Sequence, residues 1–151
     1  MKIEKNKTYE FSLKGQVSFG SVSENRVYEL LQDGRLASFF LEEQLQHWFP
    51  ELTRIEGNKD HDHVDTMGRK YDAKNFTKNG LKFKPSNQLG QGRTFNAEIA
   101  HNKARKLCYI CCDIVEFPRV RVKFIDGVDL IKEYPKCEIP KGQKWREVLF
   151  G

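Results

Sequence analysis

An acidic residue and a lysine stand two positions apart in Asp72-Ala73-Lys74, which is the only acid-x-lysine triplet in the chain. The surrounding residues have the pattern of a β-strand, and side chains alternate between the two faces of a strand. Asp72 and Lys74 are therefore expected to project from the same face. Asp62 and Asp65 lie upstream, before a glycine turn. A hairpin bend there would bring one of these carboxylates beside Asp72 and Lys74.

Two carboxylates and a lysine that converge on one point can bind a divalent cation and a phosphate. Carboxylate oxygens are hard ligands suited to Mg²⁺, which is held through few carboxylates and activates water for attack on phosphorus. A lysine in the same place can orient that water and offset the charge that builds up on the phosphate. The segment therefore predicts a Mg²⁺-dependent nuclease.

This segment resembles the active-site hairpin of the PD-(D/E)XK nuclease superfamily, and most closely that of small type II restriction endonucleases of the PvuII kind. Their pattern is Asp-x-Val-Asp-x-x-Gly-x-x-Tyr-acid-x-Lys, and it is met without a gap by Asp62, Val64, Asp65, Gly68, Tyr71, Asp72 and Lys74. Glu56-Gly57-Asn58 also matches that group, whereas the insert Lys59-Asp60-His61 and the lack of a histidine run after the strand depart from it.

The resemblance implies a catalytic set of Asp62, Asp72 and Lys74, with Mg²⁺ held by Asp62, Asp72 and the backbone carbonyl of Ala73. The spacing in that family ranks Asp62 ahead of Asp65, which stays an alternative metal ligand. The implied activity is site-specific hydrolysis of double-stranded DNA. Homing, junction-resolving and RNA-cleaving nucleases use the same kind of site and remain alternatives. Cutting both strands with one site per chain would require a homodimer.

The loop that follows the hairpin supplies candidates for DNA binding. Its glycines would let the backbone approach phosphates, and amide and guanidinium groups can bind base edges. The candidate residues are Asn87, Gln88, Gln91 and Arg93.

The hydrophobic pattern predicts a mixed α/β fold with a central mixed sheet flanked by helices, which is the restriction-endonuclease-like core that the resemblance also implies. We expect a single domain over 1–151, with an N-terminal hairpin and helices over about 1–50 that could serve in dimerisation, and a catalytic core over about 51–134.

The pattern predicts a hairpin or edge strands over 8–19, a capping box at Ser21–Glu24, helices over 24–32, 36–49, 94–107 and 128–134, and strands over 52–56, 70–76, 108–115 and 119–125. Asn79-Gly80 predicts a two-residue turn that pairs Phe76 with Phe83, and by the same register Lys82 would point away from the site. Pro135 and Pro140 predict an irregular tail.

Composition bounds the class of protein. The formal net charge of +5 is compatible with a nucleic-acid partner without demanding one. No apolar run has the length of a membrane span and the N-terminus lacks an apolar leader, so we expect a cytoplasmic protein that does not enter the membrane. A basic nucleic-acid-binding domain whose carboxylates are structural is the non-enzymatic alternative.

Two further motifs suggest zinc. His61-Asp62-His63-Val64-Asp65 resembles the first zinc motif of metallo-β-lactamase-fold hydrolases, but Thr66 stands where that family has its next histidine. The cysteines at 108, 111 and 112 lie within a predicted strand instead of a tight turn, so we expect small buried thiols there.

Overall fold

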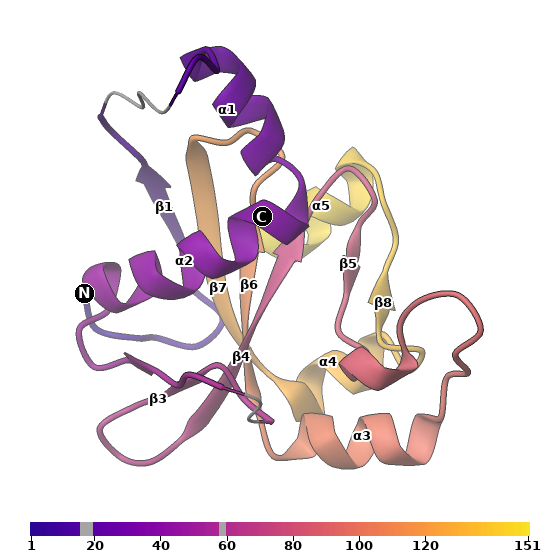
Figure 1. The fold of residues 1–151 in the computed structure, drawn as a ribbon. Coiled ribbons are helices and arrows are strands. Elements are labelled where there is room, and N and C mark those ends of the chain that lie inside the picture. Colours follow the sequence, from indigo (N-terminus) through magenta and orange to yellow (C-terminus); the bar gives the residue numbers. More distant parts are fainter. Residues whose placement is uncertain (16–19, 58–59) are drawn as a thin grey trace.

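The structure is a computed structural model that describes residues 1–15, 20–57 and 60–151. Its elements in chain order are β1 (Thr8–Ser12), α1 (Glu24–Leu31), α2 (Gly34–Trp48), β2 (Thr53–Arg54), β3 (His63–Val64), β4 (Lys70–Phe76), β5 (Leu81–Lys82), the 3₁₀ helix η1 (Ser86–Gln88), α3 (Ala97–Arg105), β6 (Cys108–Asp113), β7 (Arg119–Asp126), α4 (Gly127–Glu133), β8 (Glu138–Ile139) and α5 (Gln143–Phe150) (Figure 1). None of the helices in these ranges is long and apolar enough to cross a membrane.

The central feature is a mixed sheet in the order β1-β7-β6-β4-β3-β2. β4 and β6 are parallel, and the other neighbouring pairs are antiparallel. This confirms the predicted mixed α/β fold with helices on both faces of the sheet. Parallel strands need a crossover connection, and here η1 and α3 provide it between β4 and β6.

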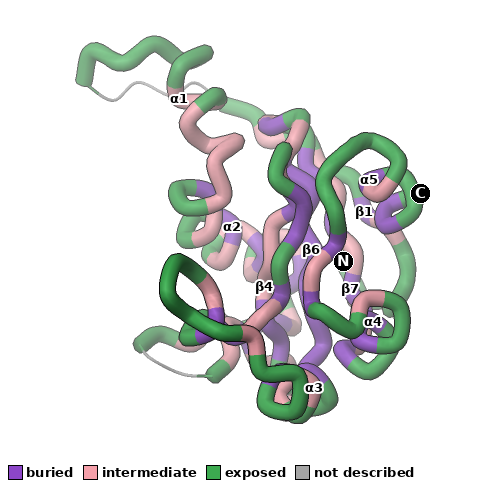
Figure 2. Tube along the Cα trace, turned by 90° about the vertical axis from the view of Figure 1, so that its right-hand side faces the viewer, coloured by how far each residue is buried: buried purple, intermediate pink, exposed green. Residues whose placement is uncertain are grey.

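Each face of the sheet has its own hydrophobic core. On one face α2 contributes Leu41 and Leu45, which pack with Phe49 and with the side of the sheet that carries Tyr71 and Phe124. The opposite face is covered by α3, α4, α5 and the small β5–β8 sheet. Every residue of β6 is buried because both faces are covered, as Figure 2 shows for the middle of the molecule. A strand buried on both faces has a nearly continuous apolar sequence. The strand predicted over 108–115 is confirmed as β6, which ends at Asp113.

Several predicted boundaries were wrong. The N-cap of α1 is Ser23, whose Oγ accepts from the N–H of Arg26 at 3.2 Å, so the predicted capping box of Ser21 and Glu24 does not form. α3 begins at residue 97, because Asn96 is its N-cap. β1 is present, whereas residues 16–19 of the predicted N-terminal hairpin lie outside the described residues.

The pairing predicted for the Asn79-Gly80 turn was also wrong. Thr77 and Gly80 exchange two backbone hydrogen bonds, at 3.0 and 2.9 Å, which makes a tight turn. The chain then leaves β4, and β5 pairs with β8 through Leu81 and Ile139. Phe76 and Phe83 are therefore not cross-strand partners, although both are buried in the same core.

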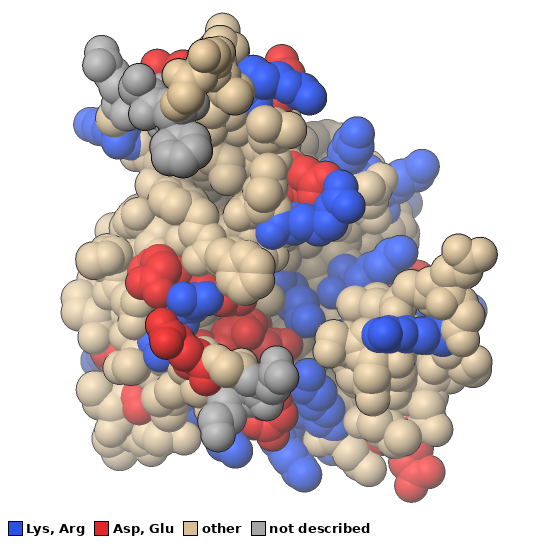
Figure 3. Space-filling model, in the orientation of Figure 1, with Lys and Arg blue, Asp and Glu red and all other residues tan. Residues whose placement is uncertain are grey.

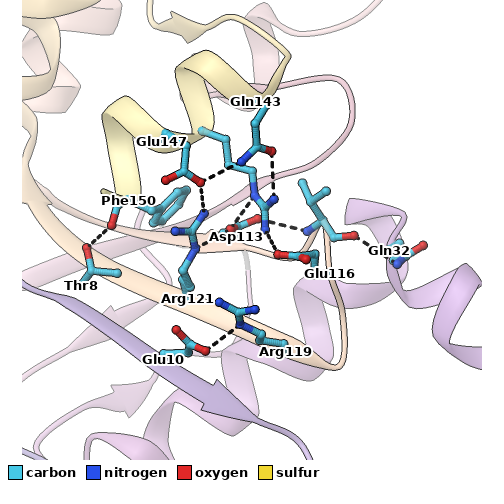
Figure 4. Close-up of polar contacts among 12 residues, drawn as sticks. Thr8, Glu10, Gln32, Asp113, Glu116, Arg119, Arg121, Gln143, Glu147 and Phe150 are labelled. Atoms are coloured by element: carbon cyan, nitrogen blue, oxygen red, sulfur yellow. Dashed lines mark hydrogen bonds and ion pairs between the residues drawn. The ribbon is translucent and has the colours of Figure 1, made fainter.

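The predicted irregular tail is instead β8 and α5. A buried polar cluster beneath α5 joins it to the sheet (Figure 4). Asp113, which is 1% exposed, accepts hydrogen bonds at its Oδ2 from the Nε atoms of Arg121 at 2.9 Å and Arg146 at 2.8 Å. Arg146 also pairs with Glu116, and Thr8 Oγ1 donates to the Phe150 carbonyl at 2.8 Å. These contacts hold the last helix against the ends of β6 and β7.

Candidate active site

The central strand β4 has an open edge that begins at Asp72. β3 pairs with β4 only at Tyr71 and Lys70, and within the described residues no strand continues along that edge. Asp62 comes just before β3 in the chain, and it lies beside β4 directly after the last β3–β4 pair. Its N–H donates to the carbonyl of Tyr71 at 2.9 Å, and its Oδ2 accepts from the N–H of Ala73 at 2.9 Å. The Asp62 carboxylate thus replaces a backbone acceptor at the point where the ladder ends.

The same hydrogen bond places the carbonyl of Ala73. In an extended strand the N–H and C=O of one residue point to the same edge. Because the N–H of Ala73 points to Asp62, the carbonyl oxygen of Ala73 also faces the open edge of β4. A carboxylate and a backbone carbonyl, both hard oxygen donors, therefore lie at one edge of the strand.

Asp72 and Lys74 complete this group. Asp72 is 6% exposed, and Lys74 Nζ lies 3.3 Å from Asp72 Oδ2. Burial and then the neighbouring Asp72 carboxylate raise the pKa of Asp62 to about 7. Two carboxylates placed so close together disfavour each other's ionisation, and a bound divalent cation would remove that repulsion. The donor set of Asp62, Asp72 and the Ala73 carbonyl therefore fits Mg²⁺, because the cation would offset the repulsion between the two carboxylates.

Asp65 has a different role in the structure. Its Oδ1 accepts from the N–H groups of Met67 and Arg69, both at 2.9 Å, and its Oδ2 accepts from the Tyr71 hydroxyl at 2.7 Å. These bonds close the turn between β3 and β4, where Gly68 adopts a φ of +82° that favours glycine. Asp62, and not Asp65, is the acid that lies beside Asp72.

The group lies in a cleft of about 950 Å³. One wall comes from α1 and α2, and the other from β5, η1 and α3. Figure 3 shows acidic side chains gathered on the β3 side of this hollow and basic side chains on the side of β5 and α3. The basic residues that line the cleft besides Lys74 are Arg26, Arg35, Lys78, Lys82 and Lys103.

The residues predicted to bind DNA do not line this cleft. Gln88 is buried, and its Oε1 accepts from the N–H of Asn96 at 2.9 Å, which fixes the start of α3. The side chain of Arg93 donates to the Ser86 carbonyl at 2.7 Å. Asn87 and Gln91 are exposed. The same loop reaches the cleft instead through Ser86 and Leu89.

Other residues also line the cleft, and of these only Glu42 was a candidate from the sequence. It was one of two acids, Glu42 or Glu43, that could add to the site from the second helix, although a solvated surface position was the favoured interpretation. Asn75 donates to Ser38 Oγ at 3.1 Å and thereby joins β4 to α2. Glu42 lines the cleft and pairs with Arg54 at 3.1 Å. Lys82, which was predicted to point away, lies in the cleft because β5 does not continue a hairpin with β4. Alternation along β4 places Asn75 on the face opposite Asp72 and Lys74, so it gave no signal for Asn75.

The histidines and cysteines are arranged differently from either zinc motif. His63 is fully buried, and its Nε2 lies 2.8 Å from the Glu42 carbonyl, while His61 Nδ1 lies 2.7 Å from Asp60 Oδ1. Burial lowers the pKa of His63. All four cysteines are buried free thiols. Across the described ranges, no group of three or more His, Cys, Asp or Glu side chains is placed to hold a metal.

No protein-family model matches this chain, and comparisons with curated proteins and with solved structures give no significant match. Its function is therefore inferred from the cleft itself.

The raised pKa of Asp62 leads to a prediction about stability. Without metal and at about pH 8, Asp62→Asn should raise the free energy of unfolding by about 1–2 kcal/mol, allowing for solvent in the open cleft. The pKa of Asp62 is about 7 in the folded protein, and it is about 4 in an unfolded chain. Wild type therefore loses stability as the pH rises from about 4 to about 7, since the unfolded state binds fewer protons in that range. The variant lacks this loss.

Urea unfolding in EDTA at about pH 5 and about pH 8 measures the effect. The gap between the variant and wild type should be small at the lower pH and grow at the higher pH. A gap of the same size at both values would show that the pKa of Asp62 is not raised in the folded protein.

Proposed function

We propose that this protein is a Mg²⁺-dependent endonuclease that hydrolyses phosphodiester bonds of double-stranded DNA. The observation that carries the proposal is the convergence of Asp62, Asp72 and Lys74 at the open edge of β4, inside a cleft whose side toward β5 and α3 is basic. Acids and a lysine that served only to stabilise the fold would not need an open cleft around them.

Asp62, Asp72 and the carbonyl of Ala73 would hold the cation. When bound, Mg²⁺ supplies polarisation of the scissile phosphate and lowers the pKa of water. Lys74 orients the attacking water and offsets negative charge on the phosphate, because its ammonium group is held beside Asp72. The hydrogen bond from Ala73 to Asp62 keeps that carboxylate aimed at the open edge.

The walls of the cleft favour a duplex as the substrate. Proteins that bind single strands stack bases on aromatic side chains. The described residues that line the cleft include no Phe, Tyr or Trp. Lys78, Lys82 and Lys103 line it without an ion pair in the described ranges, and they can contact backbone phosphates. Binding through phosphates suits a duplex, whose bases are already stacked on each other.

Cleavage of both strands leads us to propose a homodimer with two-fold symmetry. The N-terminal region is the proposed contact surface, and its helix α2 carries exposed Leu36, Phe39 and Phe40. Light scattering on active enzyme tests this proposal. A monomer that makes double-strand breaks would contradict it.

Purified protein incubated with unmethylated phage DNA, in Mg²⁺ or in EDTA, tests the activity. We expect discrete fragments in Mg²⁺ alone, as a site-specific endonuclease gives. Parallel reactions with RNA, single strands and four-way junctions separate the related activities. If none of these substrates is cut while DNA binding persists, the protein is a binding module with structural carboxylates.

A further inference from the structure

A second hollow, of about 310 Å³, opens beside the active-site cleft between the start of β4 and α3. Lys70, Asn102, Lys103 and Lys106 line it together with Asp60. Asp60 and Lys103 line the active-site cleft as well, so the two hollows adjoin each other. The surface that leads out of the active site on this side is therefore basic.

The second hollow keeps a net positive charge, because Asp60 offsets only part of the charge of its three lysines. Across the described ranges, Lys70, Lys103 and Lys106 form no ion pair, whereas Lys5 and Lys84 each pair with a carboxylate. Asp60 is the acidic residue among those that line the hollow, and its Oδ1 lies 2.7 Å from His61 Nδ1. Three ammonium groups and the amide of Asn102 are thus available to an anion.

The spacing of these residues suits a polymer with repeated phosphates. Asn102 and Lys103 lie on the last turn of α3, and Lys106 is its C-cap residue. The three positions follow one another along one face, because residues three and four apart are neighbours on a helix. Lys103 and Lys106 are about 4.5 Å apart along the helix axis. Lys70, at the start of β4, lines the same hollow.

We propose that this hollow binds the DNA backbone next to the scissile phosphate. Lys70, Lys103 and Lys106 contact successive phosphates of the duplex as it leaves the active site, and Asn102 donates a hydrogen bond to one of them. The inference rests on the proposed function, because that function places DNA in the adjoining cleft.

Fluorescence anisotropy with a short DNA duplex in EDTA, over about 50–200 mM salt, tests the proposal. The test variant is the triple change Lys70→Ala, Lys103→Ala and Lys106→Ala. The matched control is Lys132→Ala, Lys136→Ala and Lys141→Ala, which removes the same charge from exposed lysines at α4 and in the segment before α5. Each phosphate contact contributes about 0.9 to the slope of log K against log salt, so the test variant should lose about 2–3 from that slope. The control should keep the wild-type slope, and both variants should melt close to the wild-type temperature.

The outcomes separate this inference from the proposed function. Equal slopes for the test and control variants, or no salt-dependent binding by wild type, would overturn the inference even if wild type cuts DNA. A loss of slope in the test variant alone supports the inference even if wild type cuts no nucleic acid in Mg²⁺, a result that would remove the proposed nuclease activity.

Discussion

Replacing Lys74 with alanine is expected to lower the rate of Mg²⁺-dependent DNA cleavage by about 10²–10³-fold at saturating DNA, with little change in DNA affinity. Lys74 Nζ lies 3.3 Å from Asp72 Oδ2 and is held in place by that contact. Its charge acts on the phosphate where negative charge develops, so its loss should affect the chemical step more than binding. Single-turnover kinetics together with anisotropy in EDTA separates these two effects.

Two companion variants sharpen this test. Lys74→Arg should not restore cleavage, because a planar guanidinium cannot replace a compact ammonium beside Asp72. Lys132→Ala, on the exposed side of α4, should cut like wild type. Cleavage by Lys74→Ala at the wild-type rate would contradict the assigned role.

Metal binding can be measured separately from activity. Mg²⁺ should raise the melting temperature of wild type and of Lys74→Ala, because a cation that binds only the folded state stabilises it. Asp72→Ala should lose both cleavage and this rise. A rise that persists in Asp72→Ala would place the cation elsewhere.

Replacing Asp113 with alanine is expected to destabilise the fold by about 3–5 kcal/mol. The carboxylate is 1% exposed and accepts from both Arg121 and Arg146, whose side chains are 12% and 8% exposed. Its removal would leave two nearly buried guanidinium groups without their shared buried carboxylate, and only the half-exposed Glu116 and Glu147 would remain as partners. Urea denaturation gives the free energy, and the melting temperature should fall by roughly 10 °C or more.

The Glu10–Arg119 pair serves as the control, because its side chains are 52% and 49% exposed. Glu10→Gln should change stability by less than about 0.5 kcal/mol. Asp113→Leu combined with Arg146→Met should recover part of the loss, since a buried charge is then removed along with its partner. If Asp113→Ala were as stable as Glu10→Gln, α5 would not depend on this cluster.

The candidate site was predictable from the sequence as far as local geometry determines it. Asp72 and Lys74 share a face of β4 because side chains alternate along any strand. Gly68 permits the turn that brings Asp62 back to β4. These relations lie within a segment of thirteen residues, from Asp62 to Lys74, and follow from side-chain period and turn chemistry.

The choice between Asp62 and Asp65 required the three-dimensional structure. Both carboxylates precede the same turn, and both could be drawn beside Asp72 from spacing alone. The hydrogen bonds decide between them, because Asp65 satisfies the turn and Tyr71 while Asp62 binds the N–H of Ala73. Gln88 shows the same limit, since an amide in a loop can equally support the backbone of the next helix, as the bond from the N–H of Asn96 does here.

The sequence by itself determined the mixed α/β class, the helices α1 and α2, the buried strand β6 and the acidic hairpin, because each follows from a short-range pattern of apolar residues and turns. The tertiary structure alone decided what surrounds the hairpin. β5 pairs with β8 across a long stretch of chain, Lys103 reaches the cleft from α3, and α5 is held by the buried charge of Asp113. Such contacts depend on which surfaces meet when the two hydrophobic cores form, and the local spacing of apolar residues does not predict them.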